Sequence, residues 1–286
     1  MATETMSLGE QIKRVREKTG AGMMDCKRAI TESKGDFDKA VEALRKKGLA
    51  SAAKKASRTT KEGLVGAALN ADGTVGAIVE LNCETDFVAK TDEFIKLVSD
   101  LARQAMEEKI KAPQDADSQV KAVLAKLGEN MSLKRFERFA LEGVGLVAYY
   151  VHSSGAKKGA LIELSAENDA AAKSDAASEL AKELGMQIVA MSPKWLSKDD
   201  VPKETVAKER EIFETLVRKE GKPEAAVPKI VEGKINKLFF QQWCLLEQVS
   251  MRDNKTKLAK LIDEASVKAG GKLAVKRFAR YQLGGE

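Results

Sequence analysis

The chain contains the stretch GLVGAALNADGTVGAIVELNCETDFVAK (Gly63–Lys90), and a similar stretch, GLVAYYVHSSGAKKGALIELSAENDAAAK, follows at Gly145–Lys173. In both, two apolar runs flank a turn, which predicts a β-hairpin, and a helical pattern comes next. We therefore expect two similar α+β subdomains in one chain. The matched positions are Gly63 with Gly145, Gly76 with Gly159, Glu80 with Glu163, Leu81 with Leu164, Glu84 with Glu167, Asp86 with Asp169 and Lys90 with Lys173.

Three short helical patterns precede the first copy. The first begins at an S-x-x-E capping box formed by Ser7 and Glu10, and Gly20 is placed to end it. The second runs from about Met23 to Ser33 and is expected to bury Met23, Cys26 and Ile30. Three helices in so few residues bury little surface, which is more typical of a docking module than of an enzyme.

The second copy is interrupted by two charged helical stretches, from about Lys203 to Glu220 and from about Glu224 to Gln242, with Gly221-Lys-Pro223 between them. They predict an antiparallel helical hairpin. Its inner face is expected to bring Val206, Phe213 and Val217 of one arm against Val227, Val231, Ile235 and Leu238 of the other. RFARY (Arg277–Tyr281) reads as a strand that returns to the second sheet.

These patterns predict the α+β class and four parts. They are a three-helix domain (1–55), a first core subdomain (56–140), a second core subdomain (141–200 and 241–286) and an inserted helical hairpin (201–240). The basic segment KKASRTTK (Lys54–Lys61) is expected to be a mobile linker between the first two parts.

The composition is that of a globular, soluble protein, with 286 residues, 43% of them hydrophobic and 32% charged. No window is apolar enough to span a membrane, and the polar N-terminus predicts a cytoplasmic protein. Cys26, Cys83 and Cys244 are widely spaced and odd in number, which favours three buried thiols over disulfides or a zinc site.

Motifs for catalysis are lacking. No G-x-x-x-x-G-K-[ST] phosphate loop occurs, and the single histidine, His152, has no evident Ser or Cys partner. We therefore expect neither an enzyme nor a cofactor or metal site. Two other hypotheses stay open: a nucleic-acid-binding protein that uses the three-helix head, the basic linker and the net charge of +6, and an enzyme that uses His152.

The two copies differ most after the second strand. The first has Thr85-Asp86-Phe87-Val88, where the second has Asn168-Asp169-Ala170-Ala171. The shared fold therefore does not require the bulk of Phe87. Either Phe87 is a core residue with neighbours specific to the first copy, or it lies on a surface loop and a partner buries it.

Six segments spread along the chain form recognisable motifs: NCETDFVAK (Asn82–Lys90), TGAGMMDCKRAI (Thr19–Ile30), LGEN (Leu127–Asn130), GKP (Gly221–Pro223), KIVEGKINK (Lys229–Lys237) and LLEQ (Leu245–Gln248). Through these motifs the sequence resembles the elongation factor Ts family over essentially its whole length. One departure is Val249-Ser250, which stands where the family usually has Pro-Phe.

The resemblance implies a guanine-nucleotide exchange factor that binds the GTPase elongation factor Tu, displaces its magnesium and promotes release of GDP. It also implies that the three-helix domain is UBA-like and docks on the partner, whereas no direct contact with nucleic acid or membrane is expected. The residues implied in magnesium displacement are Thr85, Asp86, Phe87 and Val88. Further contacts are implied for Met23, Met24, Lys27 and His152.

Overall fold

The computed structural model describes residues 6–55 and 57–285, with the backbone alone for residues 49–55. These residues form helices and two three-stranded sheets, joined by turns and loops, which confirms the α+β class. The chain forms two compact units. One contains the residues up to Gly66, Val79–Phe136 and the segment from Leu283, and the other contains Ala67–Ile78 and Glu137–Gln282. The predicted division into four parts stays a prediction.

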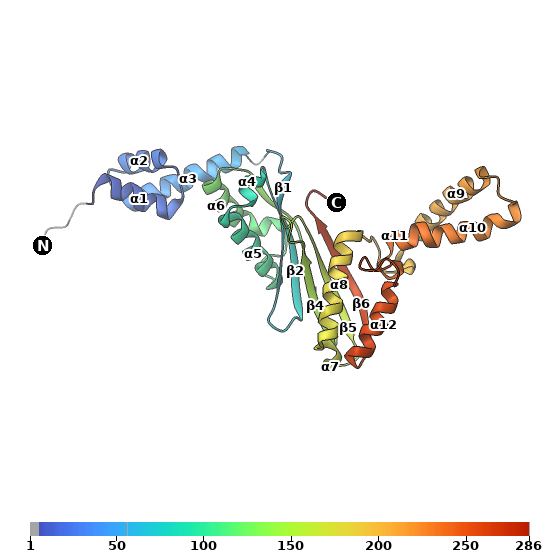
Figure 1. The fold of residues 1–286 in the computed structure, drawn as a ribbon. Coiled ribbons are helices and arrows are strands. Elements are labelled where there is room, and N and C mark those ends of the chain that lie inside the picture. The colour runs from blue at the N-terminus through green and yellow to red at the C-terminus, as the bar shows by residue number, and fades with distance from the viewer. Residues whose placement is uncertain (1–5, 56, 286) are drawn as a thin grey trace. The chain divides into compact units, whose positions relative to one another are not determined.

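The first unit begins with α1 (Leu8–Thr19), α2 (Met23–Glu32) and α3 (Phe37–Lys55), shown in blue in Figure 1. The predicted capping box of Ser7 and Glu10 is present, and Gly20 ends α1 with a φ of 67°. The core of these helices consists of Val15, Cys26, Ala29, Ile30, Ala40 and Leu44.

The predicted burial of Cys26 and Ile30 on α2 is confirmed, but the prediction that Met23 is buried is wrong, because Met23 is 59% exposed. Met23 is the first residue of α2, and the buried face of this helix begins one turn later at Cys26. The apolar spacing identified the helix correctly but not the point at which the core begins.

The predicted linker Lys54–Lys61 is not a free segment where the structure describes it. Helix α3 extends to Lys55. The Arg58 side chain lies 3.4 Å from Glu84, and its carbonyl oxygen accepts a 2.8 Å hydrogen bond from Asn130 Nδ2. These contacts hold the segment against Glu84, which follows the second strand, and Asn130, which precedes the third.

The first sheet has the order β1 (Glu62–Leu69), β2 (Val75–Cys83), β3 (Met131–Ala140). The predicted turn between β1 and β2 is present, and Asn70 Oδ1 accepts hydrogen bonds from the backbone N–H groups of Thr74 and Val75, both at 2.9 Å. Glycine is required at the start of the hairpin, because a Cβ atom on Gly63 would lie 2.1 Å from the Leu81 carbonyl oxygen. The same constraint recurs in the second copy, where a Cβ atom on Gly145 would lie 2.0 Å from the Leu164 carbonyl oxygen.

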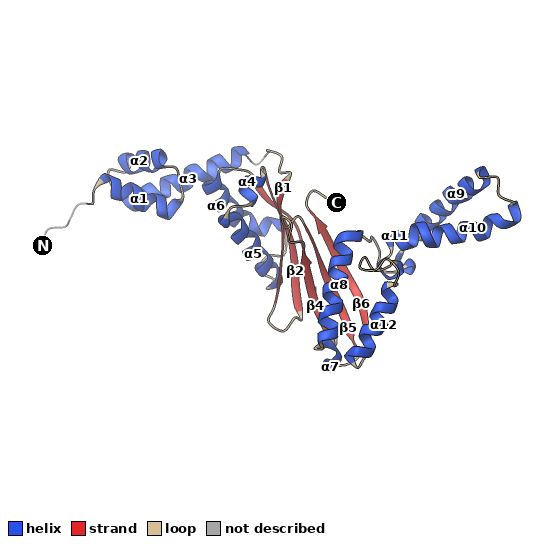
Figure 2. Ribbon diagram, viewed as in Figure 1, coloured by secondary structure: helices blue, strands red, loops and turns tan. Residues whose placement is uncertain are grey.

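The second sheet is antiparallel, with the order β4 (Gly145–Val151), β5 (Lys158–Ala166), β6 (Leu273–Gln282). The predicted return of RFARY is confirmed, because Arg277–Tyr281 lies within β6. Helices α8 (Asp175–Met191) and α12 (Leu258–Ala269) cover this sheet (Figure 2), and they share a core with it that includes Ile162, Leu184 and Ile262. At the Val249-Ser250 corner, Ser250 is buried and its N–H donates to the Thr256 carbonyl oxygen at 2.8 Å.

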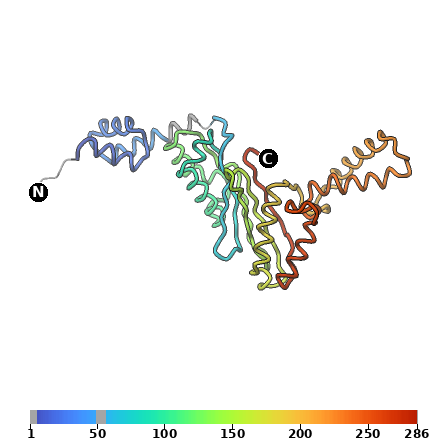
Figure 3. The backbone as a smooth tube through the Cα atoms, in the orientation of Figure 1, coloured from blue at the N-terminus to red at the C-terminus, as the bar shows by residue number. Residues whose placement is uncertain are grey.

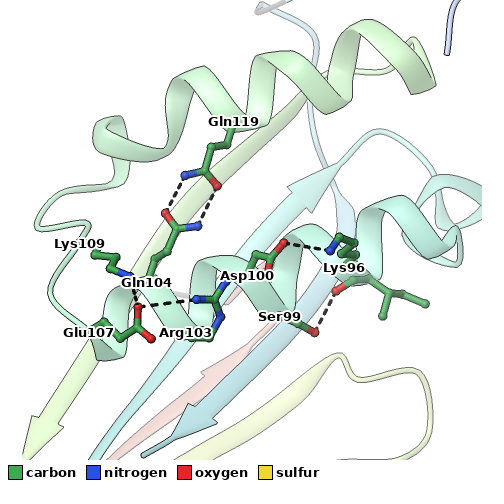
Figure 4. A network of polar contacts seen from close by, with 9 residues as sticks. Lys96, Ser99, Asp100, Arg103, Gln104, Glu107, Lys109 and Gln119 are labelled. Carbon is green, nitrogen blue, oxygen red and sulfur yellow. Dashed lines mark hydrogen bonds and ion pairs between the residues drawn. The ribbon is translucent and has the colours of Figure 1, made fainter. Parts of the chain in front are cut away.

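In the first unit, α5 (Asp92–Met106) and α6 (Asp117–Leu127) follow the hairpin, with a 3₁₀ turn at Pro113–Ala116 before α6. The inner face of α5 buries Phe94, Leu97, Val98 and Leu101. Its outer face carries a polar network (Figure 4), in which Arg103 contacts both Asp100 and Glu107. The Gln104 and Gln119 side-chain amides exchange two hydrogen bonds, at 2.9 and 2.6 Å, which join α5 to α6.

Helices α9 (Lys203–Lys219) and α10 (Val227–Lys234) run side by side (Figure 3) and share a small core of Val217, Val227, Val231 and Ile235. A π-helical segment, Ile235–Phe240, follows α10 and leads into α11 (Gln241–Trp243). The prediction for Leu238 is wrong: its side chain is half exposed, whereas Phe239 is buried. The wider π turn changes which side chains face inward, and α-helical spacing does not foresee it.

The internal repeat extends into the third strand of each sheet, which the sequence prediction missed. Lys134-Arg135-Phe136 of β3 matches Lys276-Arg277-Phe278 of β6. In each unit the matched arginine bonds a buried glutamate that was itself matched from sequence. Arg135 Nε donates to Glu80 at 2.8 Å, and Arg277 Nε donates to Glu163 at 2.6 Å.

All three cysteines are free and buried, as predicted. Burial raises the pKa of the Cys83 thiol to about 12 and that of Cys244 to about 11, so neither forms thiolate near neutral pH. We expect a thiol reagent such as DTNB to label no cysteine of the native chain at pH 8 and all three in denaturant. Rapid labelling of one native thiol would show that its surroundings open to solvent.

Candidate partner-binding site

The segment TDFV forms a one-turn helix rather than the expected surface loop. Strand β2 ends at Cys83, and Thr85 is the N-cap of α4 (Asp86–Ala89), with its hydroxyl accepting from the Val88 N–H at 3.4 Å. Thr91, the N-cap of α5, donates from its hydroxyl to the Val88 carbonyl oxygen at 2.8 Å. Helix α4 is therefore anchored to α5 at its C-terminal end.

Phe87 and Val88 face opposite environments. Phe87 is 79% exposed, whereas Val88 is 8% exposed. Asp86 forms an ion pair with Lys90 at 2.6 Å, and Lys90 Nζ lies 6.0 Å from the centroid of the Phe87 ring. Leaving such a ring in water costs roughly 1.5–3 kcal/mol relative to burial, so Phe87 stands out among the apolar side chains of this unit.

The second copy shows which of these positions the fold requires. Its equivalent turn, α7 (Asp169–Ala172), is capped by Asn168, whose Oδ1 accepts from the Ala171 N–H at 2.8 Å. Ala171, matched to Val88, is buried, and Ala170, matched to Phe87, is exposed. The position of Val88 is therefore a core position in both copies, and that of Phe87 is a surface position in both. Of the two explanations for Phe87, the structure excludes the core one.

Two glutamates, Glu84 and Glu129, hold the start of α4, and no role was predicted for either of them from the sequence. Glu84 accepts from the Asn130 N–H at 2.6 Å. Glu129 accepts from the Thr85 N–H at 3.0 Å and from the Thr85 hydroxyl at 2.8 Å. Bonding partners so far apart in the chain leave no local sequence pattern. The one signal in the sequence was that the two glutamates lie in the NCETDF and LGEN motifs.

The other predicted contact residues lie on two separate elements. Met23, Met24 and Lys27 are all exposed on α2, with Met24 at 69%. His152 is exposed just after β4, and its Nδ1 lies 3.1 Å from the Tyr150 hydroxyl. The structure thus groups Thr85–Val88 on α4 and the two methionines with Lys27 on α2.

The described residues hold no candidate metal site. Over residues 6–55 and 57–285, no group of three or more His, Cys, Asp or Glu side chains is arranged to hold a metal ion. Within the same ranges no helix is both long and apolar enough to cross a membrane. The feature that the site does offer is an aromatic side chain on a capped turn.

The fold and the site define a two-sheet α+β protein with Phe87 exposed on a one-turn helix. A family model described as Elongation factor TS matches residues 84–285. An Elongation factor Ts of Clostridium botulinum (strain Alaska E43 / Type E3) is 44% identical over 290 residues, which cover 98% of this chain and 93% of that protein. The Elongation factor Ts of Nitratidesulfovibrio vulgaris (strain DP4) is 45% identical over 273 residues, covering 96% of this chain and 94% of that protein. The chain belongs to the elongation factor Ts family, a family of translation elongation factors.

Proposed function

We propose that the chain is a guanine-nucleotide exchange factor for the translational GTPase elongation factor Tu. It acts in the cytoplasm by binding this partner, and it is not an enzyme with a substrate of its own. Family membership supports the choice of partner. The observation that carries the proposal is Phe87, an aromatic residue that is 79% exposed on a turn whose counterpart in the second copy carries alanine.

The four residues of the TDFV segment have two roles. Asp86 and Phe87 are the contact residues, because their side chains reach solvent. Thr85 and Val88 hold the turn, one as its N-cap and the other through burial against the body of the unit. Phe87 enters the partner between helices of its GTPase domain, and Asp86 contacts the same region.

Displacement of magnesium explains how this contact releases GDP. A bound magnesium ion neutralises the charge of the nucleotide phosphates. When the inserted turn shifts the groups that hold the ion, the phosphate charge is left uncompensated and the nucleotide binds less tightly. The exchange factor needs no reactive group for this step.

The differential binding free energy that exchange requires is larger than one phenylalanine supplies, so the chain needs a second contact with the partner. An exchange factor works only if it binds the nucleotide-free partner more tightly than the loaded one. Moving a two-state equilibrium from 1:99 to 99:1 takes about 5.5 kcal/mol, whereas burying one phenylalanine contributes roughly 1.5–3 kcal/mol. We assign the remainder to the exposed surface of Met23, Met24 and Lys27 on the UBA-like three-helix domain, and to His152. The four-part division, with the hairpin at 201–240 as an insertion, belongs to the same proposal.

The test is release of a fluorescent GDP analogue from purified elongation factor Tu. We expect the chain to accelerate release at catalytic concentration and to do so with little change between 50 and 200 mM salt. Binding that relied on a nucleic acid would lose affinity steeply over this range, because counterion release makes it strongly salt-dependent. No acceleration at either salt concentration would refute the proposal.

A further inference from the structure

Glu129 bonds both polar groups of the residue that caps α4. One carboxylate oxygen accepts from the Thr85 N–H at 3.0 Å, and the other accepts from the Thr85 hydroxyl at 2.8 Å. Hydrogen bonds to an ionised acceptor are stronger than neutral ones. Glu129 precedes β3, so it links the cap to a part of the unit that lies 44 residues away in sequence.

Helix α4 needs such support. It has only four residues, too few for a helix to be stable by its own backbone bonds. The bond from its cap, the Val88 N–H to the Thr85 hydroxyl, is 3.4 Å long, beyond the usual range for a hydrogen bond of this kind. The ring of Phe87 cannot help, because it is exposed and packs against no core.

The second copy provides an internal comparison. Glu84 accepts from the Asn130 N–H at 2.6 Å, and the matched Glu167 accepts from the Lys272 N–H at 2.9 Å. This shared bond aligns the segments before the third strands, and it places Gly271 where the first copy has Glu129. A Cβ atom on Gly271 would lie 2.6 Å from Asn168 Nδ2, so no longer side chain fits there without a shift of the Asn168 side chain.

The two copies therefore cap the same turn differently. In the second copy Asn168 caps α7 through a 2.8 Å bond, without a carboxylate, and the turn presents Ala170. In the first copy the cap bond is long, Glu129 holds the capping residue, and the turn presents Phe87. This pair of hydrogen bonds from Thr85 to the Glu129 carboxylate, called the carboxylate clamp below, occurs in the copy that presents the aromatic ring.

We infer that Glu129 is a positioning residue for nucleotide exchange, one that acts through Phe87 by holding α4 in the orientation in which it meets the partner. This inference rests on the proposed exchange function. A turn that is ordered before binding loses less conformational entropy when it inserts, so the clamp strengthens the productive contact without touching the partner.

A double-mutant cycle tests the inference with the full chain. The variants are Glu129→Ala, Phe87→Ala and the combination, and the measurement is release of the fluorescent GDP analogue from elongation factor Tu. We expect Glu129→Ala to slow release by about two- to tenfold, the range for one poorly ordered group at an interface. In the Phe87→Ala background the same change should have no further effect, because the residue through which it acts is gone.

A second readout and a control separate positioning from general stability. Hydrogen exchange of the Thr85 and Val88 amides should become faster in Glu129→Ala, while that of the central strand β2 stays unchanged. The matched control is Asn168→Ala, which removes the cap of α7 and should leave the release rate unchanged.

The outcomes distinguish the positioning role of Glu129 from the proposed exchange function. Multiplicative effects of the two substitutions, or equal slowing by Asn168→Ala, would overturn the positioning role while leaving the exchange function in place. A full-length chain that does not accelerate release at all would overturn the proposed function, and the inference with it. Slowing that disappears in the Phe87→Ala background supports both.

Discussion

Replacing Phe87 with alanine is expected to slow GDP release from elongation factor Tu by about 10- to 100-fold. The substitution removes one aromatic ring that the partner would bury, worth roughly 1.5–3 kcal/mol, and each 1.4 kcal/mol corresponds to a factor of ten in rate. Because Phe87 is 79% exposed in this chain, loss of its ring should change the free energy of unfolding by no more than about 0.5 kcal/mol. Release of a fluorescent GDP analogue and urea denaturation measure the two effects separately.

Phe94→Ala is the matched control for this prediction. Phe94 lies in α5 a few residues away and is completely buried, so its replacement should cost about 3–5 kcal/mol of stability. If Phe87→Ala destabilises the chain to a similar degree, Phe87 is a core residue in solution and the proposed contact is wrong. A variant that is stable and fully active would show that another contact drives exchange.

Arg277→Ala is expected to lower the free energy of unfolding by about 3 kcal/mol, and clearly more than Arg135→Ala. Both arginines are partly exposed, at 45% for Arg277 and 25% for Arg135, but each bonds a buried glutamate, and removing the cation leaves that carboxylate without its counter-charge. Glu80 would retain Lys134 at 3.8 Å and the Gly284 N–H at 3.1 Å. Among the described residues, Arg277 is the one ion-pair partner of Glu163, so its loss leaves that carboxylate buried without a cation.

Urea denaturation followed by circular dichroism measures this difference. Lys276→Ala is the control, because this neighbouring lysine is exposed and should contribute within about 0.5 kcal/mol. Adding Glu163→Gln to Arg277→Ala should recover part of the loss, because it removes the buried charge. Equal losses for the two arginines would mean that the contacts of Lys134 and Gly284 do not compensate Glu80.

The parts of the fold that followed from sequence are those with local signals. Alternating apolar runs around a turn gave the hairpins, and the capping box of Ser7 and Glu10 gave the start of α1. Comparing the two copies position by position showed that the shared fold does not require the bulk of Phe87, although a core position stayed open until the structure showed the residue to be exposed. The match of Lys134-Arg135-Phe136 with Lys276-Arg277-Phe278 was present in the sequence too, and it would have predicted β3 as the counterpart of β6.

The parts that sequence did not give depend on distant residues or on a change of helical geometry. Glu129 reaches Thr85 across 44 residues, and no periodic pattern encodes such a pairing. Met23 falls on the apolar stripe of α2 but lies one turn before the buried face of this helix begins. Leu238 turns outward because Ile235–Phe240 is a π-helix. The TDFV segment looked like a loop because a single helical turn is too short to show periodicity.

The pairing of β5 with β6 sets the order in which this chain can fold as it leaves the ribosome. The buried glutamate and its arginine are separated by 55 residues in the first sheet and by 114 in the second. Until the last strand emerges, β5 has an open edge and Glu163 has no counter-ion, and exposed strand edges promote aggregation. A nascent chain stalled before Leu273 would therefore be a prime substrate for chaperones, with its first sheet complete and its second still lacking a strand.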